Sequence, residues 1–337
     1  MQPAVVTIGN FDGVHAGHRA LLQRARALAD RRAARVVALV FDPHPTGVLR
    51  PGSAPPRLTS FAQRESLLRR AGADEIVKLT PTPQLLDQTP DEFLLSLVQQ
   101  RHPIAIVEGP DFNYGRGRAG SIATLLEEGR RMGFAVEVVQ PVEATLCDES
   151  IVRVSSTLVR RLIIDGRVRD AARLLGRRHE LRGLVTRGDQ RGRTIGFPTA
   201  NLVQPGGDES VLLPAQGVYA AWATTPDGRR FAAAVNIGAR PTFDAPEPRI
   251  EAHLIDPNTA APASGIPDYG WVLRLELDSW VRDTVKFAGI APLRSQLERD
   301  RAAAVELLRC TSATGTTDGE FPARCGFPAG ALRASAS

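Results

Sequence analysis

The sequence predicts two domains of different class: an α/β domain with a doubly wound parallel sheet, then a small closed antiparallel β-barrel with a terminal helix. Three observations predict this architecture. The chain has 337 residues, which is too long for one ordinary compact domain. Its first half alternates short β-branched runs with stretches of helical apolar period. Its second half instead has six short β-rich runs without long helices between them.

The elements of the first half follow in a regular order. Strands are predicted at residues 5–8, 36–41, 76–79, 104–107 and 136–139. Apolar residues recur at helical spacing after the first strand, at Leu21, Leu22, Ala25, Leu28 and Ala29. Ser60 is placed to cap a second helix that Gly72 ends, and further helices are expected near 90–100 and 121–132. Ligands of such sheets bind beyond the carboxyl ends of the strands, so we expect a ligand near residues 7–25.

In the second half, strands are predicted at residues 181–187, 199–203, 217–225, 229–237, 249–255 and 271–277. Pro226, Asp227 and Gly228 form a hairpin signal between two of them. A helix over about 293–308 follows, and the Thr-, Gly-, Ala- and Ser-rich remainder predicts a disordered tail. We therefore divide the chain into domains at 1–178 and 179–309 and a tail at 310–337.

Composition bounds the class of protein. Hydrophobic residues make up 43% and charged residues 23%, no apolar run approaches the ~20 residues of a membrane span, and no leader pattern is visible, so we expect a cytoplasmic protein. The three cysteines have no pairing pattern, which favours reduced thiols over a disulfide or metal site. The net charge of +5 leaves nucleic acid, anionic small substrates or a coding bias towards arginine open. Because aromatics are only 5% and do not interleave with basic residues, nucleic-acid binding is not expected as the main role.

The stretch GNFDGVHAGH, residues 9–18, predicts a phosphate site where the first strand meets a helix. A helix N-terminus has unpaired N–H groups and attracts anions. Gly9 and Gly13 allow a sharp turn close to a ligand, while His15 and His18 project from the same side of the helix start with Gly17 between them. This is the HxGH pattern of nucleotidyltransferases, although so short a pattern also fits ordinary surface histidines.

A second hydroxyl-rich helix start lies at residues 152–163. Ser155, Ser156 and Thr157 lead into a helix with Arg160 and Arg161, and such hydroxyls act either as phosphate ligands or simply as helix caps. A doubly wound sheet can bring this segment to the first one. There Arg153 or Arg160 would balance the charge of a triphosphate.

The barrel half has glycines at 183, 188, 192 and 196, followed by the sequence GFPTAN. The glycines predict a mobile loop whose N–H groups wrap phosphates, or a plain flexible hairpin. Thr199 and Asn201, two apart on an extended strand, point to the same face and offer two neutral oxygens to Mg²⁺.

The motifs GNFDGVHAGH, FDPHP (41–45), GPDFNYGRGRAG (109–120) and VSSTLVR (154–160) resemble the adenylyltransferase module of bifunctional riboflavin kinase/FAD synthetases. The resemblance implies transfer of AMP from ATP to FMN, with His15 and His18 catalytic. It implies nucleotide contacts from Gly9, Asn10, Phe11, Gly17, Arg153, Ser156, Thr157 and Arg160. Asp111, Phe112 and Tyr114 would border the flavin or the nucleotide pocket. For Asp42 and His44, a rigid loop between two prolines and a substrate contact are both open.

The barrel half resembles the riboflavin kinase module through GFPTAN, NIGARPTF (236–243) and IEAHLID (250–256). The resemblance implies that Glu251 accepts the proton of the ribityl hydroxyl before attack on the γ-phosphate of ATP. Thr199 and Asn201 would hold Mg²⁺, with Gly188, Gly192, Arg193 and Gly196 at the phosphates. Three departures stand out from the family pattern: a longer link at 257–268, Thr284 in place of glutamate, and Arg178-His179 in place of Pro-Tyr.

The expected function is therefore phosphorylation of riboflavin to FMN and adenylylation of FMN to FAD, with ATP, riboflavin and FMN as substrates and Mg²⁺ as cofactor. The nearest alternative is an adenylyltransferase whose barrel binds flavin without turning it over. A flavin-sensing or RNA-binding regulator and a small-molecule ligase with the same HxGH motif are further alternatives. We expect small-molecule partners only, no nucleic acid or membrane, and a monomer or weak homo-oligomer.

Overall fold

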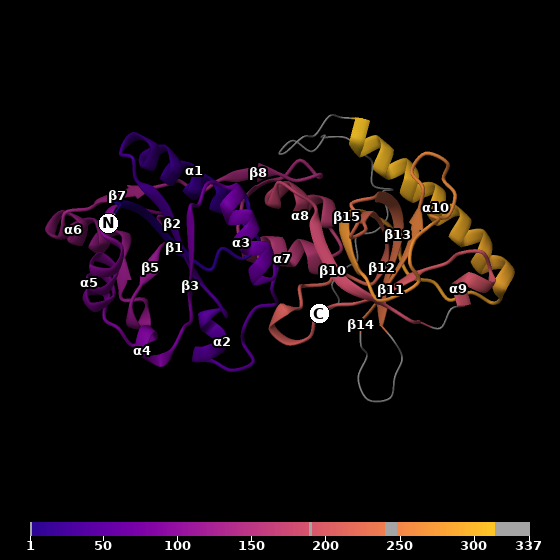
Figure 1. The fold of residues 1–337 in the computed structure, drawn as a ribbon, viewed down its shortest axis with the longest axis horizontal. Helices are drawn as coiled ribbons and strands as arrows, with labels where there is room; N and C mark the ends of the chain where they lie inside the picture. The colour runs from indigo at the N-terminus through magenta and orange to yellow at the C-terminus, as the bar shows by residue number, and fades with distance from the viewer. Residues whose placement is uncertain (1, 189–190, 240–247, 314–337) are drawn as a thin grey trace.

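The computed structural model describes residues 2–188, 191–239 and 248–313. It contains an α/β domain and a β-barrel that lie side by side along the long axis of the molecule, with helices α7 (Ser156–Ile164) and α8 (Val168–Leu175) between them (Figure 1). In this part of the chain, no helix combines the length and the apolar character that crossing a membrane requires. The predicted division into two classes of domain is confirmed.

A five-stranded parallel sheet forms the centre of the α/β domain, in the order β3-β2-β1-β4-β7. Its strands are β1 (Ala4–Gly9), β2 (Arg35–Phe41), β3 (Glu75–Leu79), β4 (Pro103–Glu108) and β7 (Ala135–Val138). The central strands are continuous apolar runs because helices cover both faces of the sheet. The order reverses between β1 and β4, which places the expected ligand crevice at the carboxyl ends of these two strands.

Helices connect these strands as predicted, and side-chain caps fix where they begin. Ser60 caps the helix before β3 through a capping box with Gln63, and Thr89 and Glu92 form another box at the helix before β4. The helices of this domain are α1 (Ala16–Arg31), α2 (Pro45–Leu49), α3 (Phe61–Arg70), α4 (Pro83–Leu86), α5 (Pro90–Arg101) and α6 (Ile122–Met132).

The domain also contains short elements that the sequence pattern did not predict. Each of them is too short to show a period. They are the strands β5 (Asn113–Tyr114), β6 (Gly120–Ser121), β8 (Glu143–Thr145) and β9 (Ile151–Arg153) and the 3₁₀ turn η1 (Arg116–Arg118). β5 pairs with β6 and β8 with β9 in two small antiparallel ladders. β9 leads directly into α7, so the second hydroxyl-rich segment begins at the end of a hairpin.

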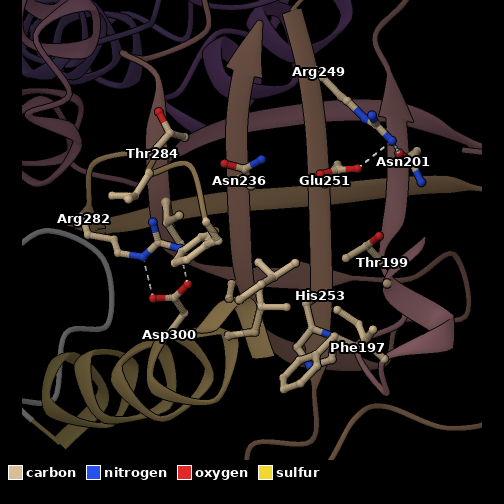
Figure 2. Close-up of a pocket in the computed structure, with 18 residues that line it drawn as sticks. Phe197, Thr199, Asn201, Asn236, Arg249, Glu251, His253, Arg282, Thr284 and Asp300 are labelled. Carbon is tan, nitrogen blue, oxygen red and sulfur yellow. Dashed lines mark hydrogen bonds and ion pairs between the residues drawn. The ribbon is translucent and has the colours of Figure 1, made fainter. Parts of the chain in front are cut away.

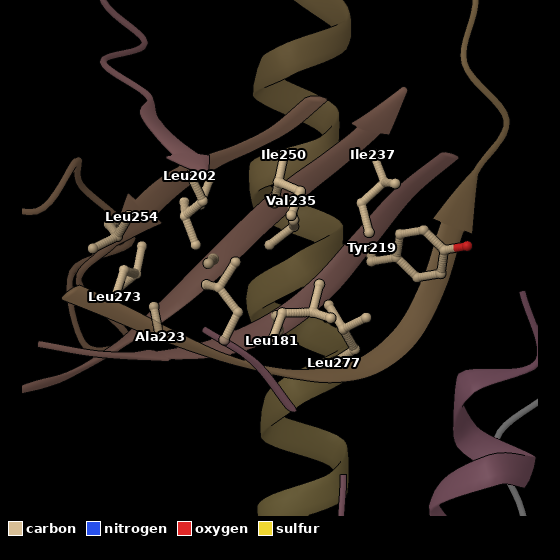
Figure 3. Close-up of a cluster of buried hydrophobic side chains, with 14 of the residues drawn as sticks. Leu181, Leu202, Tyr219, Ala223, Val235, Ile237, Ile250, Leu254, Leu273 and Leu277 are labelled. Carbon is tan, nitrogen blue, oxygen red and sulfur yellow. The ribbon is translucent and has the colours of Figure 1, made fainter. Parts of the chain in front are cut away.

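Six antiparallel strands close into a barrel in the order β10-β11-β14-β13-β12-β15. They are β10 (His179–Thr186), β11 (Ala200–Val203), β12 (Gly217–Thr224), β13 (Arg230–Ala239), β14 (Pro248–Ile255) and β15 (Val272–Arg282). Inward-facing side chains from all six fill its interior, among them Leu181, Leu202, Tyr219, Val235, Ile250 and Leu277 (Figure 3). The predicted hairpin is present, since Thr225 and Arg229 bond across the turn at Gly228.

A long helix, α10 (Ile290–Ala313), packs on the outside of the barrel. Ala304, Val305 and Leu308 are buried against Ala220 and Ala232 of the barrel wall. The helix is longer than predicted at both ends and continues four residues past our domain limit at 309, so residues 310–313 are helical rather than tail. The rest of the proposed tail, 314–337, lies outside the described residues, as do 240–243 of the NIGARPTF motif. Two short turns, α9 (Arg191–Thr194) and η2 (Gly207–Glu209), complete the elements.

Charged and polar contacts hold the junction between the domains. Asp278 of β15 is buried and pairs with Arg178 at 2.6 Å and with Arg169 of α8 at 3.2 Å. His179, also buried, contacts the carbonyl of Leu212 at 2.8 Å. Arg178 and His179 thus contribute a buried ion pair and a side-chain contact to the backbone at this junction.

Candidate functional site

The two histidines of the HxGH motif lie at the N-terminus of α1 with their rings stacked. His15 is the N-cap of the helix, and its Nδ1 accepts a hydrogen bond of 3.4 Å from the N–H of His18. The ring centroids are 3.7 Å apart with 16° between the planes, and Phe11 packs on His18 edge-on at 5.2 Å. His15 and His18 therefore act as one unit at a helix end that attracts anions.

Both imidazoles are neutral near pH 7. Burial, followed by the charge of Arg19, lowers the pKa of His15 to about 4. Burial, followed by the neighbouring His15, lowers the pKa of His18 well below its usual range. His18 Nδ1 is buried and finds no hydrogen-bond partner among the described residues. A neutral pair offers N–H donors to a polyphosphate without the cost of holding two adjacent cations before it binds.

The loop before α1 has little room for larger side chains. A Cβ at Gly17 would lie 3.2 Å from the His15 ring, and one at Gly9 would lie 3.4 Å from the Phe11 ring. Phe11 itself has a φ of 47°, a left-handed conformation that is unusual for a bulky residue. Such strain persists only where the surroundings impose it and is concentrated at functional sites. The turn thus presents the backbone of Asn10 and Phe11 beside the histidines.

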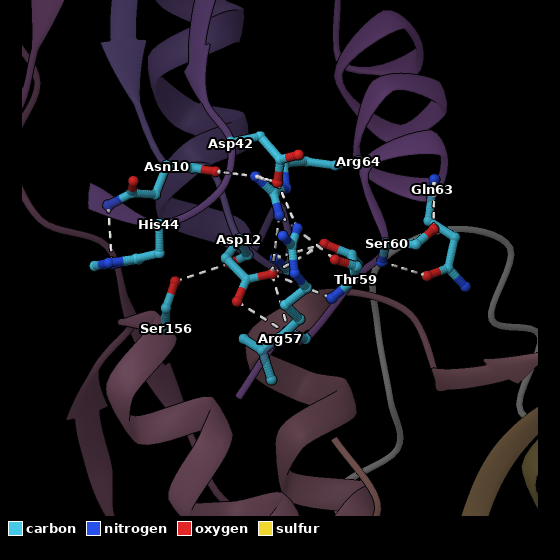
Figure 4. A network of polar contacts seen from close by, with 12 residues as sticks. Asn10, Asp12, Asp42, His44, Arg57, Thr59, Ser60, Gln63, Arg64 and Ser156 are labelled. Atoms are coloured by element: carbon cyan, nitrogen blue, oxygen red, sulfur yellow. Dashed lines mark hydrogen bonds and ion pairs between the residues drawn. The ribbon is translucent and has the colours of Figure 1, made fainter. Parts of the chain in front are cut away.

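Asp12 holds the loop before α1 in place through a buried network of hydrogen bonds and ion pairs (Figure 4). Its carboxylate accepts hydrogen bonds of 3.0–3.1 Å from the N–H groups of Leu58 and Thr59 and from the hydroxyl of Thr59. Arg64, 3% exposed, lies 3.8 Å from Asp12 and donates to the carbonyls of Asn10 and Phe41. These bonds hold the ends of β1 and β2 at one position.

The same aspartate brings the second predicted segment to the first. Ser156 Oγ donates to the Asp12 carbonyl at 2.8 Å, and Arg160 reaches the Asp12 carboxylate at 2.6 Å and the Pro56 carbonyl at 2.8 Å. The N-termini of α7 and α1 therefore meet, although 140 residues separate Asp12 from Val152 at the start of the segment. Ser155 is the N-cap of α7, as the capping alternative predicted, and Ser156 takes the bridging role. In this structure the Arg160 guanidinium donates hydrogen bonds to Pro56 and Asp12 of the protein itself.

Arg153 and Thr157 lie at the exposed side of this meeting point. Arg153 forms an ion pair with Asp111 on the loop after β4, and both side chains are more than half exposed. The predicted nucleotide contact and the predicted flavin contact are thus neighbours. Thr157 is exposed in the first turn of α7.

Phe112 and Tyr114 differ in accessibility. Their rings stack at 5.7 Å, but Tyr114 is buried beneath, where it packs on Phe93 and contacts the Thr124 hydroxyl at 3.3 Å. A Cβ at Gly120 would lie 2.6 Å from the Tyr114 ring. Tyr114 therefore positions the loop, and Phe112 is the member of the pair with access to a ligand.

His44 contacts Asn10 across the crevice, and its hydrogen bonds define the orientation of both groups. The N–H of Thr46 donates to His44 Nδ1 at 3.2 Å, so the neutral ring has its proton on Nε2, which lies 3.2 Å from the Asn10 amide. The structure places Asn10 Nδ2 at this nitrogen and leaves Asn10 Oδ1 without a partner among the described residues. Two N–H donors cannot bond to each other, so the amide must be turned to present its oxygen to His44. Asp42 instead pairs with Arg57 and Lys78, which supports the rigid-loop interpretation for Asp42.

One buried carboxyl of this domain was missed by sequence reasoning. Glu108, at the end of β4, accepts a 2.5 Å hydrogen bond from the N–H of Ile8 and a 3.3 Å bond from Thr7. Burial raises its pKa well above the usual range. It closes the gap between β1 and β4 where their pairing ends after Val6, so it supports the strand that leads into the HxGH loop.

The barrel contains a cavity of about 370 Å³ between its wall and α10 (Figure 2). Four predicted residues line it: Gly192, Thr199, Asn201 and Glu251. The same cavity is lined by residues that the sequence analysis did not single out as site residues, namely Asn236, Arg249, His253, Arg282 and Asp300.

Strand register places the polar groups of the cavity in a row. Asn201 of β11 lies opposite Glu251 of β14, which in turn lies opposite Asn236 of β13. Arg249, two residues before Glu251, pairs with it at 2.8 Å and donates to Asn201 Oδ1 at 3.2 Å. A carboxylate for proton transfer thus lies beside two amides and a guanidinium.

The glycines of the barrel loop fall into two groups. A Cβ at Gly188 would lie 2.3–2.5 Å from the Asn201 amide, and one at Gly192 would lie 2.2 Å from the Phe197 carbonyl. These two glycines shape the surroundings of Asn201 and Thr199. Gly196 has a φ of 85° with open space around it, and Arg193 is exposed and paired with Asp268.

The residues present fit Mg²⁺. Thr199 and Asn201 present neutral oxygens into one cavity beside Glu251, and the two glycines give them a close-fitting cradle. No cluster of three or more His, Cys, Asp or Glu side chains suited to a metal occurs within the described ranges. A magnesium ion here would therefore rely on few protein ligands and complete its shell with phosphate and water.

The wall opposite Glu251 comes from the end of β15 and from α10. Arg282 forms two bonds of 2.6 and 2.8 Å to Asp300, which is buried and also accepts from Gln296. Thr284 follows on the same wall and lines the cavity. The longer link at 257–268 contributes no lining residue.

His253 has one nitrogen in use and one without a partner in the described part of the chain. Its Nδ1 contacts the Pro198 carbonyl at 2.8 Å, which places the proton there and leaves buried Nε2 as an acceptor. Burial lowers its pKa, so it stays neutral. Period-two alternation along 249–255 would have grouped Arg249, Glu251 and His253 on one face, and this signal was in the sequence.

Comparison with known proteins gives matches over both domains. Residues 1–158 match the family model for FAD synthetase, and residues 175–308 match the model for riboflavin kinase. The chain is 33% identical over 308 residues to the bifunctional riboflavin kinase/FMN adenylyltransferase of Escherichia coli strain K12, covering 91% of this chain and 93% of that protein. It is 31% identical over 308 residues to the protein of the same name from Bacillus subtilis strain 168, covering 90% and 92%.

A solved structure shares the whole architecture. It is described as a macrolide-efflux protein from Streptococcus pneumoniae, is 30% identical, and superposes with a TM-score of 0.79. The match covers 90% of this chain and 94% of that one. The pairing of this α/β domain with this barrel is therefore not peculiar to the present chain.

Proposed function

The chain belongs to the family of bifunctional riboflavin kinase/FMN adenylyltransferases, and we propose that it makes FMN in the barrel and FAD in the α/β domain. The substrates are riboflavin, FMN and ATP. The observation that carries this assignment is the presence of two separate polar sites, one at the paired histidines of α1 and one at the row of Asn201, Glu251 and Asn236. We assign the first to residues 1–178 and the second to residues 179–309.

In the barrel, Glu251 takes the proton of the ribityl 5′-hydroxyl. The hydroxyl oxygen forms a bond to the γ-phosphorus of ATP, the bond from that phosphorus to the bridging oxygen breaks, and ADP leaves. Glu251 lines the cavity and lies opposite both amides in register, which supports this role. Gly188, Gly192, Arg193 and Gly196 are proposed to surround the phosphates, with Gly192 lining the cavity itself.

Thr199 and Asn201 are proposed to hold Mg²⁺. A bound ion would neutralise part of the phosphate charge and so reduce the repulsion that an incoming hydroxyl oxygen meets. The role of this chain is to fix the two neutral oxygens. Gly188 leaves room for the Asn201 amide, because any Cβ at position 188 would overlap it. The extended strand keeps Thr199 on the same side as Asn201.

In the α/β domain, a phosphate oxygen of FMN attacks the α-phosphorus of ATP, and pyrophosphate leaves. No protein nucleophile is needed, so positioning and charge stabilisation do the work. His15 and His18 are proposed to donate N–H groups to the phosphates at the mouth of α1. Their neutral state and the partner-free His18 Nδ1 among the described residues support this.

The other proposed contacts of this site surround the histidine pair. Gly9, Asn10, Phe11 and Gly17 line the loop at the histidines, and Ser156, Thr157 and Arg153 lie where α7 meets it. Asp111 and Phe112 are proposed to border the flavin, with Tyr114 beneath them. Arg160 would have to exchange its bond to Asp12 for a phosphate.

We further propose a cytoplasmic enzyme that acts as a monomer or weak homo-oligomer on small molecules and does not bind nucleic acid. Sedimentation of the purified chain tests the oligomeric state. A gel-shift series at low and high salt tests nucleic-acid binding, since non-specific binding weakens steeply with salt.

The direct test incubates the purified full chain with riboflavin, ATP and Mg²⁺ and separates the flavins by chromatography. We expect FMN first and FAD later. Formation of neither would refute the assignment. FAD from supplied FMN, but no FMN from riboflavin, would reduce the chain to an adenylyltransferase with a flavin-binding barrel.

A further inference from the structure

The inference concerns Arg177 and rests on the adenylyltransferase function proposed for the α/β domain. Arg177 lies in the short segment between α8 and β10, directly after Gly176, which ends α8 with a φ of 64°. The segment lies within residues 175–308, which match riboflavin kinase, and outside residues 1–158, which match FAD synthetase. The side chain of Arg177 nevertheless contacts the loop that precedes the paired histidines of the first site.

The Arg177 guanidinium holds the backbone carbonyls of this loop. Its Nη2 donates to the Gly13 carbonyl at 2.7 Å, and its Nη1 donates to the Val14 carbonyl at 3.5 Å. Nη1 also donates to the Leu175 carbonyl at 3.4 Å, at the end of α8. Arg19 of α1 shares the Val14 and Leu175 carbonyls, whereas the shortest bond of Arg177 goes to Gly13.

The two carbonyls belong to a strained stretch of backbone. Gly13 has a φ of 83° and Val14 a φ of 41°, and a positive φ in a β-branched residue is a genuine outlier. The N–H of Gly13 is held by the Thr59 hydroxyl at 3.2 Å, and Arg177 holds the carbonyl side. Because the C=O and N–H of a trans peptide point in opposite directions, a donor on the Val14 carbonyl also directs the N–H of His15 away from Arg177. Such a conformation persists only where its surroundings impose it, and Arg177 is one of the groups that do so.

The positive charge of Arg177 also acts on the histidines. Its hydrogen bonds all go to backbone carbonyls, and within the described ranges it forms no ion pair with a carboxylate. Burial, followed by the charge of Arg19, lowers the pKa of Arg177 to about 10, so it remains a cation at neutral pH. Burial is the main cause of the low pKa values of His15 and His18, and the charge of Arg177 adds to it in both. A cation held by neutral carbonyls keeps its charge available to an anion at the neighbouring helix end.

We propose that Arg177 is a positioning residue of the adenylyltransferase site, supplied by the segment that leads into the barrel. It fixes Gly13 and Val14 so that the histidines and the N–H groups at the start of α1 face the phosphates of ATP, and its charge favours the binding of these phosphates. The site that forms FAD therefore depends on a residue from the part of the chain that matches riboflavin kinase.

The first test measures FAD formation from supplied FMN by the full chain in the wild type, Arg177→Met, Arg177→Lys and the control Arg178→Gln. Methionine fills the space without donors or charge, lysine keeps a donor and a charge, and Arg178 pairs with Asp278 of the barrel instead. In Arg177→Met we expect kcat to fall about 10-fold or more and the KM for ATP to rise about fivefold, with the KM for FMN within about twofold. Arg177→Lys should recover the rate to within about threefold, and Arg178→Gln should match the wild type. Unchanged FMN formation in the barrel reports that each variant is folded.

The second test measures binding without turnover. Inorganic pyrophosphate is titrated into each chain while the NMR signals of the His15 and His18 imidazoles are followed, with His253 of the barrel as the reporter of the other site. We expect the Kd of pyrophosphate at the histidine pair to rise about 10-fold in Arg177→Met and to stay within about threefold in Arg177→Lys. A merely structural role would lower the folded fraction and leave the Kd of the folded molecules unchanged.

Equal kinetics and equal pyrophosphate affinity in Arg177→Met and the wild type would overturn the proposal. The same loss in Arg177→Lys as in Arg177→Met, or in Arg178→Gln, would also overturn it, because packing or the junction as a whole would then be the cause. If Arg177→Met does not fold, Arg177→Gln replaces it: its side chain is too short and uncharged, so it must show the same losses. A wild type that makes no FAD from FMN would refute the adenylyltransferase function, while the pyrophosphate titration would still decide whether Arg177 supports an anion site at the histidines.

Discussion

The two proposed ATP sites are built in opposite ways. In the α/β domain, α1 and α7 come from distant parts of the chain, and Asp12, whose carboxylate is buried, joins them through Ser156 and Arg160. In the barrel, Asn201, Glu251 and Asn236 lie side by side because their strands are hydrogen-bonded neighbours. The first site therefore depends on a remote network, whereas the second depends on strand register.

Separate sites should fail separately, and this is the largest effect we expect. His18→Ala removes an N–H donor at the phosphates and should lower FAD formation by about 100-fold or more, while FMN accumulates. Asn201→Ala should stop FMN formation to a similar degree, yet FAD should still form from supplied FMN. Chromatography of both flavins over time measures this. If one substitution abolished both reactions in a folded chain, the separation of the sites would be wrong.

The remote network of the α/β domain gives the second prediction. Asp12→Asn removes the buried counter-charge of Arg160 and one of the two near Arg64, which keeps Asp42 at 3.6 Å. The domain should therefore lose about 3–5 kcal/mol of stability and its FAD formation with it. The barrel should keep its unfolding transition and its FMN formation. Thermal unfolding followed by calorimetry resolves the two domains.

The control for this change is Asp30→Asn, which removes an exposed aspartate paired with Arg26 on α1. It should cost less than about 1 kcal/mol. A single loss shared by both domains in Asp12→Asn would contradict the local role of the network.

The histidine pair should make the α/β domain sensitive to acid. His15 has a folded pKa of about 4 against 6.5 when unfolded, so below pH 6.5 the unfolded chain binds the proton more strongly. Stability should therefore fall as pH drops from 6.5 towards 4, by about 2 kcal/mol between pH 7 and 5 from His15 alone. Urea unfolding at several pH values measures this slope.

His15→Gln should flatten that dependence, whereas substitution of the exposed His102 by asparagine should leave the wild-type slope. An unchanged slope in His15→Gln would show that other groups cause the acid sensitivity. The barrel adds acid sensitivity of its own, because burial also lowers the pKa of His179, to about 4, and that of His253.

Two glycines of the barrel loop should give the smallest and most local effects. Gly188→Ala drives a Cβ into the Asn201 amide and should slow FMN formation about 10-fold, with FAD formation unaffected. Gly196→Ala meets open space and should cost only about 1 kcal/mol of barrel stability from its positive φ, with FMN formation nearly unchanged. Kinetics on both variants decides whether position 188 acts through Asn201.

The strands and helices with a clear period were predictable from the sequence, and so were Thr199, Asn201 and Glu251 sharing one cavity. The meeting of α1 and α7 was expected in outline. Its cause, Asp12, was not, because the partners Thr59, Arg64 and Arg160 carry no local signal of a shared contact. Glu108 was missed for the same reason, since an isolated acid at a strand end looks exposed until the neighbouring strand is placed.

Arg249 and His253 could have been found from the sequence. They flank Glu251 at a spacing of two on a predicted strand, which places all three on one face. The stacking of His15 on His18 was not accessible in the same way. It depends on the N-cap geometry of one residue and on the packing of Phe11, and neither follows from a four-residue motif.

Closure of the barrel also affects which part of the chain aggregates first. A closed barrel has no unpaired strand edge, whereas the parallel sheet ends in β3 on one side and β7 on the other. Both edge strands are short and carry charges, at Glu75, Lys78 and Glu137, which discourages pairing with another chain. When the chain is heated or concentrated, aggregation should therefore begin at the sheet margins of the first domain, and neutralising Lys78 should hasten it.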